Sequence, residues 1–234
     1  RYTPNANYNG GDSFTYTVAN DAEVPSYSSA TVRVDVTAVN DGPTTVADFG
    51  TVVSSAGTSV RVLSNDSDID GDTLTITEVT FEGETHEVSG ETTITGATTG
   101  SQVVVNPANG RISFVPEGDW YKALSADDVI EKVLSYKVAD PGGVESDATN
   151  LTLTVQGVND APEVASSAIT LSGTEDGANV TGSLSDYASD PDQGSQLTFS
   201  VAAGGDPENG TLTVNPDGTF SYNPEDNFYG DDTF

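Results

Sequence analysis

The sequence predicts an all-β protein built from tandem β-sandwiches of about 120 residues each. Three observations lead to this fold class. Apolar and polar residues alternate along several short segments, which is the pattern of strands with one buried face. Turn-forming sequences separate these segments. The pattern also repeats along the chain, since Phe14 aligns with Leu134 at an offset of 120 (134 − 14).

Comparison of the chain with itself defines the repeat. Residues Tyr2–Phe14 match Tyr222–Phe234 without a gap, at an offset of 220. Another copy of this stretch lies at Phe114–Tyr121, and the segment that follows it, Leu134–Asp140, matches Phe14–Asn20. Repeated units of this length are expected to fold as separate domains.

We therefore expect three segments. Residues 1–41 are the C-terminal part of one repeat, residues 42–160 are a complete repeat, and residues 161–234 are the N-terminal two-thirds of a further repeat. Only the complete repeat carries two insertions, at residues 78–99 and 122–133.

The elements of the complete repeat follow from its local patterns. Strands are predicted where apolar and polar residues alternate, at 74–81, 111–116, 134–138 and 150–155. The sequences NPANG and NPDG are typical of turns between hairpin strands. In the insertion 122–133, the spacing of Ala, Leu, Val and Ile predicts a short amphipathic helix with Ser125 as its cap.

Charge excludes several classes of partner. The chain has 37 acidic and 7 basic residues, which gives a net charge of −30. Phosphate backbones and anionic membrane surfaces would be repelled, so neither nucleic acid nor direct membrane insertion is expected. No stretch is apolar for long enough to cross a bilayer.

The content of cysteine and histidine limits the chemistry. There is no cysteine and one histidine, His86, so disulfides, thiolate sites and multi-histidine metal centres are excluded. Nucleophile, base and cofactor motifs are also missing, and we expect no enzyme activity.

Acidic and amide side chains recur at matching places in the repeats. The sequence Asn-Asp-x-Pro stands at 40–43 and again at 159–162, an offset of 119. About thirty residues later come SDIDGD at 67–72 and SDPDQG at 189–194. Such loops supply the oxygen ligands that Ca²⁺ takes, about six to eight per ion. Without a cation the clustered carboxylates repel one another, so the sequence predicts cation-dependent joints.

These motifs together resemble the bacterial cadherin-like tandem-repeat domains of large secreted adhesins of the RTX and biofilm type. Residues 136–162, YKVADPGGVESDATNLTLTVQGVNDAP, are similar to the end of a cadherin repeat. Residues 2–18 and 63–79, YTPNANYNGGDSFTYTV and LSNDSDIDGDTLTITEV, resemble the bacterial domains more closely. The resemblance implies a row of cadherin-like, immunoglobulin-like sandwiches with Ca²⁺ at the junctions, where each ion is held by one linker and by loops of the next domain.

The ligands are carried over from that family by position. The first junction would use Asn40, Asp41, Asp68, Asp70 and Asp140. The second would use Asn159, Asp160, Asp190 and Asp192, with its counterpart of Asp140 expected beyond residue 234. Candidates for further carboxylates are Asp12 and Asp232, at the domain-end position, and Glu175, at an acidic position that cadherins carry early in a repeat. The middle repeat departs from this pattern, because its aligned stretch VSSAGTS has no carboxylate.

The same resemblance implies a function. The chain would be a non-catalytic, calcium-stiffened extender of a large adhesin on the bacterial cell surface, and would support adhesion or biofilm formation. Its partners would be the neighbouring repeats of the same chain. Two alternatives stay open: a module that recognises a glycan or a protein through the insertions of the middle repeat, and a filament subunit joined head to tail by strand complementation.

Four other motifs have simpler explanations. Asp66 to Thr77 nearly fits an EF-hand loop, but its last position is Thr77 and its flanks have the pattern of strands. His86 is expected to be a solvated surface residue. Trp120 aligns with Tyr8 and Phe228, which favours core packing over a sugar platform. A further group of carboxylates, Asp127, Asp128 and Glu131, is expected on a solvated helical face and not in a glycosidase site.

Overall fold

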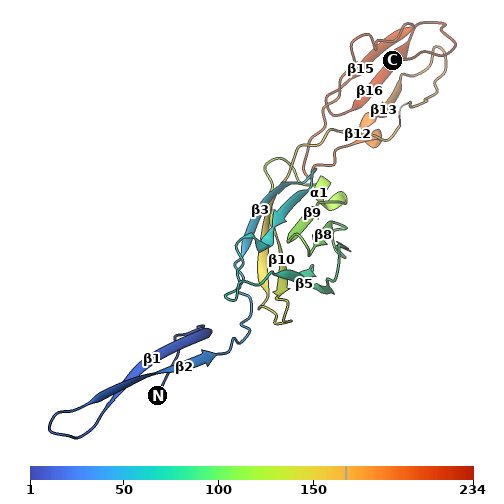
Figure 1. Cartoon of the computed structure of the whole chain (residues 1–234). Helices are drawn as coiled ribbons and strands as arrows, with labels where there is room; N and C mark the ends of the chain where they lie inside the picture. Colours follow the sequence, from blue (N-terminus) through green and yellow to red (C-terminus); the bar gives the residue numbers. More distant parts are fainter. Residues whose placement is uncertain (167) are drawn as a thin grey trace.

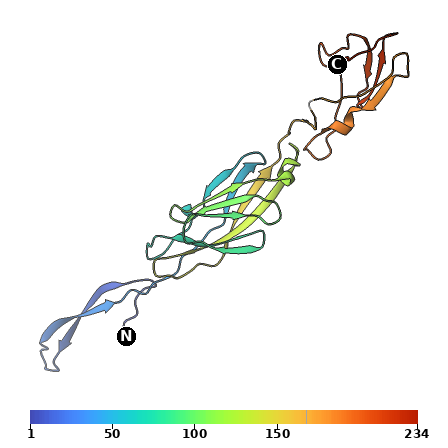
Figure 2. The ribbon, with the colours of Figure 1, turned by 90° about the vertical axis from the view of Figure 1, so that its right-hand side faces the viewer.

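The computed structural model describes residues 1–166 and 168–234. The chain forms an extended row of β-rich parts with its two termini toward opposite ends (Figure 1). Its exposed surface is 14810 Å², against roughly 10,000 Å² expected for a compact protein of the same mass. Figure 2, a view from the side, shows the same elongated arrangement. The all-β fold class predicted from the sequence is confirmed.

A single hairpin forms the N-terminal part. Strands β1 (Gly10–Ala19) and β2 (Tyr27–Val36) pair in antiparallel register, with Gly10 opposite Val36. The open end of this hairpin therefore lies at the first linker, and its turn points away from the rest of the chain (Figure 1).

The middle part contains two sheets. One sheet has the strand order β3-β11-β10-β5-β6 and is made of β3 (Asp48–Val53), β11 (Thr149–Gln156), β10 (Val129–Ala139), β5 (Thr75–Phe81) and β6 (Glu84–Glu87). The other has the order β4-β9-β8-β7 and is made of β4 (Thr58–Arg61), β9 (Arg111–Val115), β8 (Gln102–Asn106) and β7 (Thr92–Thr95). Strands occur at all four of the places where alternation predicted them. The insertion 78–99 contributes β6 and β7, which are the edge strands of the two sheets.

The core of the middle part comes from the inward rows of these strands. Tyr136 and Val138 on β10 and Leu151, Leu153 and Val155 on β11 are almost fully buried. They pack with side chains of the second sheet in one hydrophobic cluster. Each fully buried apolar side chain of this size contributes about 1.5–3 kcal/mol, so this cluster is the main source of stability in the chain.

The C-terminal part repeats a portion of this architecture. Its sheet has the order β13-β16-β15, made of β13 (Val180–Ser183), β16 (Thr219–Pro224) and β15 (Gly210–Val214). This order corresponds to β4-β9-β8 of the middle part. A short antiparallel pair, β12 (Glu163–Val164) and β14 (Ala188–Ser189), lies next to the second linker, and the one-turn 3-10 helix η2 (Leu184–Tyr187) precedes β14.

The helix predicted for the insertion 122–133 is wrong. A one-turn helix α1 (Asp119–Lys122) ends where the insertion begins. The backbone N–H and hydroxyl of Ser125 then donate to Asp128 Oδ2, at 2.9 and 2.8 Å, which closes a turn. From Val129 onward the chain is strand β10, because pairing with β11 satisfies its backbone and overrides the local helical spacing.

Trp120 and His86 also differ from expectation. Trp120 is 46% exposed and lies edge-on to Tyr121, with 4.8 Å between ring centroids. Tyr121 is the residue that enters the core, at 1% exposure, so the core role expected for Trp120 is wrong. His86 is half-buried on β6, opposite Val79, and is not the solvated residue expected.

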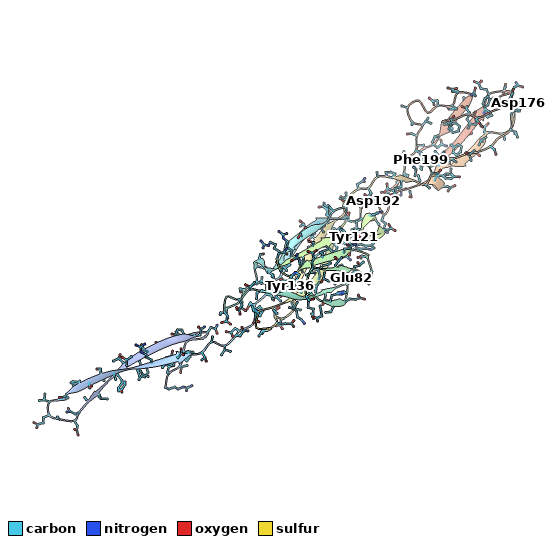
Figure 3. All side chains as sticks on the ribbon, turned by 45° about the vertical axis from the view of Figure 1, so that its right-hand side comes forward. Glu82, Tyr121, Tyr136, Asp176, Asp192 and Phe199 are labelled. Atoms are coloured by element: carbon cyan, nitrogen blue, oxygen red, sulfur yellow. The ribbon has the colours of Figure 1, made fainter. Side chains whose placement is uncertain are left out.

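Two carboxylates lie inside the middle part and share one hydroxyl. Tyr136 donates to Asp48 Oδ2 at 2.7 Å and lies 3.2 Å from Asp66 Oδ2 (Figure 3 labels Tyr136). Asp66 also accepts the backbone N–H of Val46 at 2.8 Å. Burial raises the pKa of Asp48, and the negative charge of Asp66 raises it further. Burial likewise raises the pKa of Asp66, while burial and both carboxylates raise that of Tyr136.

We expect Tyr136→Phe to lower the free energy of unfolding by about 1–3 kcal/mol near neutral pH, because it removes the donor shared by a buried carboxylate, Asp48, and a half-buried one, Asp66. The pKa values of Asp48 and Asp66 are raised in the folded state, so at a pH above them the folded state bears the cost of both negative charges. As the pH falls through these pKa values, the carboxylates become protonated and the cost disappears. The decrease in unfolding free energy caused by Tyr136→Phe should therefore be smaller at low pH. Denaturant unfolding at about pH 7 and about pH 5 measures both quantities.

The matched control is Tyr16→Phe. Tyr16 aligns with Tyr136 at the 120-residue offset and is 46% exposed. Its hydroxyl makes no hydrogen bond to another side chain within the described ranges, so its loss should leave stability unchanged. An equal loss from both substitutions, or a loss from Tyr136→Phe that does not vary with pH, would contradict this account.

Candidate metal centres at the two linkers

The first linker is tied to a loop of the middle part. The backbone N–H of Asp41 donates to Asp70 Oδ2 at 2.8 Å, and the side-chain amide of Asn40 donates to Asp140 Oδ2 at 2.7 Å. Thr44 and Ser67 exchange two backbone hydrogen bonds just after the linker, at 2.8 and 2.9 Å. These contacts bring together the predicted residues of the first junction, which we call the first joint: Asn40, Asp41, Asp68, Asp70 and Asp140.

The Asp-x-Asp loop of the first joint has a fixed local shape. The backbone N–H of Asp70 donates to Asp68 Oδ1 at 2.8 Å, as in an Asx-turn. Gly71 then takes a positive φ of 82° and its N–H donates to the Asp68 carbonyl at 3.2 Å. This sequence of turns leaves the second oxygen of Asp68, Oδ2, buried and without a hydrogen-bond partner in the part of the chain that the structure describes.

Asp140 enters the first joint from the loop after β10. It is 6% exposed, and its Oδ1 accepts the N–H of Val144 at 2.9 Å. The Asn40 amide holds the pKa of Asp140 below its usual value, with help from the backbone N–H groups of Val144 and its neighbours. Gly142 lies so close that an added Cβ would be 3.1 Å from the side-chain atoms of Asn40 and Asp140. Because its pKa is lowered, the Asp140 carboxylate is held in its ionised form.

Asp72 was not among the predicted ligands but belongs to the same neighbourhood. Partial burial raises its pKa, and the negative charges of Asp68, Asp140 and Asp70 raise it further. The sequence SDIDGD contains this residue, but the aligned SDPDQG has Gly194 in its place, so the comparison of repeats gave no signal for it. Asp72 therefore adds a fourth carboxylate near Asp68, Asp140 and Asp70.

The second linker repeats the main contact of the first. The backbone N–H of Asp160 donates to Asp192 Oδ2 at 2.8 Å, and the N–H of Asp192 donates to Asp190 Oδ1 at 2.9 Å. The amides of Asn159 and Asn40 both donate to the carbonyl of the next residue, at 2.9 and 3.3 Å, but only Asn40 also donates to a carboxylate among the described residues. We call this set the second joint: Asn159, Asp160, Asp190 and Asp192.

Asp192 is the most enclosed carboxylate of the second joint. It is 3% exposed, and Figure 3 shows it at the narrow connection between the middle and C-terminal parts. Its Oδ1 is buried and has no hydrogen-bond partner among residues 1–166 and 168–234. Each joint thus contains one buried carboxylate oxygen that no donor of the described residues satisfies, a feature that is costly unless a cation or water is bound.

The three remaining predicted carboxylates lie elsewhere. Asp12 accepts the hydroxyl of Tyr2 at 2.9 Å, and the aligned Asp232 accepts that of Tyr222 at 2.8 Å. Asp232 also accepts the backbone N–H groups of residues 208 and 209. Glu175 is exposed beside Asp176, which Figure 3 places toward the far end of the C-terminal part. Hydrogen bonds of the described residues join none of the three to either joint.

The chemistry of the joints favours a hard cation. Their side chains offer carboxylate and amide oxygens, which Ca²⁺ prefers. In the described residues, no group of three or more His, Cys, Asp or Glu side chains already converges as a metal site. The unsatisfied oxygens of Asp68 and Asp192 nevertheless fit a cation, because each is a buried carboxylate oxygen without a donor among the described residues. The lowered pKa of Asp140 keeps a further carboxylate of the first joint ionised.

The EF-hand alternative does not fit the structure. The stretch from Asp66 to Thr77 is preceded by the one-turn 3-10 helix η1 (Val62–Ser64) and runs into strand β5. Asp66, the first position of the motif, faces Tyr136 in the interior and not the Asp-x-Asp loop.

In the described ranges, no helix is long and apolar enough to cross a membrane.

Comparison with known proteins gives a family and a set of structures. A family model for the bacterial cadherin-like domain matches residues 40–157 and again residues 159–234. No curated protein matches the chain. Similar solved structures include PcdhgB3 EC1-4, with 15% identity, a TM-score of 0.44 and coverage of 92% of this chain and 48% of that one.

Two other solved structures have similar statistics. Protocadherin gammaB7 EC3-6, a cis-dimer structure, has 15% identity, a TM-score of 0.41 and coverage of 95% and 52%. The human desmocollin-1 ectodomain has 14% identity, a TM-score of 0.36 and coverage of 94% and 39%. The chain therefore spans about half of these structures or less.

Proposed function

Because the chain belongs to the family of bacterial cadherin-like domains, we propose that it is a non-catalytic, calcium-stiffened extender of a large bacterial adhesin. In this role the repeats hold a distal binding module away from the cell surface, outside the cell. The repeat boundaries near residues 41 and 160 are part of the proposal, as is a contribution to adhesion or biofilm formation.

The observation that carries the proposal is the shared build of the two joints. In both, the N–H of a linker aspartate binds the second carboxylate of an Asp-x-Asp loop at 2.8 Å. In both, one buried carboxylate oxygen lacks a donor within the described part of the chain. A Ca²⁺ ion would be held by Asn40, Asp41, Asp68, Asp70 and Asp140 at the first joint and by Asn159, Asp160, Asp190 and Asp192 at the second.

Stiffening follows from electrostatics. Carboxylates a few ångströms apart repel one another at a solvated joint, and a divalent ion converts that repulsion into attraction. The elongated arrangement in Figures 1 and 2 and the large exposed surface suit a spacer, since the parts follow one another in a row. Asp12, Asp232 and Glu175 are proposed to serve other junctions of the same kind.

Calcium titration by calorimetry tests the proposal. We expect binding at both joints, with Asp68→Asn weakening only the first and Asp192→Asn only the second, on the order of tenfold or more. Calcium at a hundredfold excess over the dissociation constant should also stabilise the folded chain by about 2.7 kcal/mol per site, so chelation lowers Tm.

Asp217→Asn is the matched control for the titration. Asp217 is an exposed carboxylate outside both joints, and it accepts the N–H and the hydroxyl of Thr219. Its replacement should leave calcium binding unchanged. No heat of binding to the unmodified chain, or equal losses from Asp68→Asn and Asp217→Asn, would rule the calcium proposal out.

A second candidate function is ligand binding by the middle part, and the exposure of Trp120 favours it. The ammonium of Lys132 lies 4.5 Å from the centre of the Trp120 ring. Trp120 shortly precedes the insertion 122–133 that only this repeat carries, and Lys132 lies within it. An exposed aromatic face beside a polar group suits a sugar or a peptide.

Screening of a glycan array tests this candidate. Binding that Trp120→Ala abolishes and that Tyr8→Ala, the aligned substitution in the first repeat, leaves intact would support recognition by the middle part. Loss of binding from both substitutions, or no binding at all, would leave the extender as the better account.

Self-association is the remaining proposal, and it rests on the apolar face of the N-terminal hairpin. Phe14, Tyr16 and Val18 are 50, 46 and 54% exposed. In the middle part, the aligned Leu134 and Tyr136 are each 1% exposed. Residues 161–234 of a second copy would cover that face and join molecules head to tail. Sedimentation over a range of concentrations should then show oligomers that Phe14→Asp disrupts, and monomers throughout would contradict it.

A further inference from the structure

One loop of the middle part contacts both sides of the second linker. It comprises residues 123–128, and we call it the latch loop. On one side the carbonyl of Ala123 accepts the backbone N–H of Gln193, which belongs to the Asp-x-Asp loop of the C-terminal part, at 3.1 Å. On the other side the carbonyl of Asp128 accepts the N–H of Gly157, at the start of the linker, at 2.8 Å.

The close approach of the latch loop requires a glycine. A Cβ on Gly157 would overlap the carbonyl oxygen of Ser125 and lie 2.7 Å from that of Leu124. The residue aligned with Gly157 in the first repeat is Ala38, at the linker offset of 119 (157 − 38). An alanine there could not accept such a loop.

The first repeat indeed has no latch loop in its sequence. Tyr8 and Phe14 are 6 positions apart, whereas the aligned Trp120 and Leu134 are 14 apart. The loop and the glycine that receives it therefore occur together in the middle repeat, and both are missing from the first. This pairing indicates that the insertion is built to pack on the linker and on the domain that follows.

The Asp-x-Asp loop is also more enclosed at the second joint than at the first. Asp192 is 3% exposed, whereas the aligned Asp70 of the first joint (192 − 122) is exposed. A groove of about 730 Å³ runs across the second linker and is lined from the middle part by Ser54, Glu117 and Lys122 and from the other side by Asp160 and Pro191. Lys122, at the end of α1, places a positive charge beside this acidic linker.

We propose that the latch loop docks the C-terminal part onto the middle part and holds the second joint in one orientation without a cation. The first joint follows a repeat that lacks the loop, so its orientation depends on the linker alone. The two joints then differ in stiffness when no calcium is bound: the first bends and the second is fixed. This inference does not rest on the calcium proposal.

The test measures distances across each joint in the full chain. The natural chain has no cysteine, so spin labels can be placed in pairs by Ser28→Cys with Thr93→Cys across the first joint and Thr93→Cys with Thr213→Cys across the second. All three of these positions are exposed. In chelator, electron–electron double resonance should give a broad distance distribution across the first joint and a narrow one across the second.

Gln193→Pro removes the N–H donor and keeps the local turn. Ser195 donates to the carbonyl of Asp192 at 3.3 Å, and Gly194 has a φ of 86°, so Gln193 stands at the second position of a type II turn, where proline is favoured. Loss of the hydrogen bond should shift the ratio of docked to undocked molecules about two- to tenfold and broaden the second distribution. Gln193→Ala keeps the N–H and is the matched control.

Gly157→Ala disrupts the packing of the latch loop on the linker, because its Cβ displaces the loop. It also reproduces the alanine of the first repeat. Broadening of the second distribution by either variant, with the first distribution and Gln193→Ala unchanged, supports the latch. A second distribution as broad as the first in the unmodified chain, or one that neither variant alters, overturns it. Both readings are made in chelator, so they are independent of whether calcium binds.

Discussion

The structure depends on one hydrogen bond that is made twice. The N–H of the linker aspartate, Asp41 or Asp160, donates to the second carboxylate of the Asp-x-Asp loop in the domain that follows. This bond fixes where each linker meets the next domain, and it gathers the acidic side chains of each joint. It also holds negative charges near one another, so the attachment of the linker and the attraction for a cation have the same origin.

The middle part supplies a hydrophobic core, which the linkers lack. Its core is closed by the inward rows of β10 and β11, and the core cluster contains no residue of either joint. The residues around the joints can therefore differ without a change to the core. The second joint gains a loop and a glycine at Gly157 that pack across the linker, whereas the first carries the more open set with Asp72 and Asp140. The same repeat can therefore form joints of different stiffness through small changes outside its core.

Much of the fold and of the joints follows from the sequence because those features are local and repeated. Alternation along β5, β9, β10 and β11 marks the strands, and the matching Asn-Asp and Asp-x-Asp sequences mark residues that the structure brings together. Features that depend on distant contacts were missed. The spacing in 122–133 fits a helix as well as a strand, and only pairing with β11 decides between them. Tyr121 and not Trp120 enters the core, and alignment could not choose between two adjacent aromatic residues. The Asp48–Tyr136–Asp66 group is assembled by residues up to 88 positions apart.

The central claim is that each joint is completed by Ca²⁺, and a high-resolution crystal structure of the chain grown in abundant calcium tests it most directly. The account predicts an ion at the first joint within about 2.3–2.6 Å of carboxylate oxygens that include Asp68 Oδ2. It predicts a second ion in contact with Asp192 Oδ1. Maps that show only water beside Asp41, Asp68 and Asp70, in crystals saturated with calcium, would contradict it.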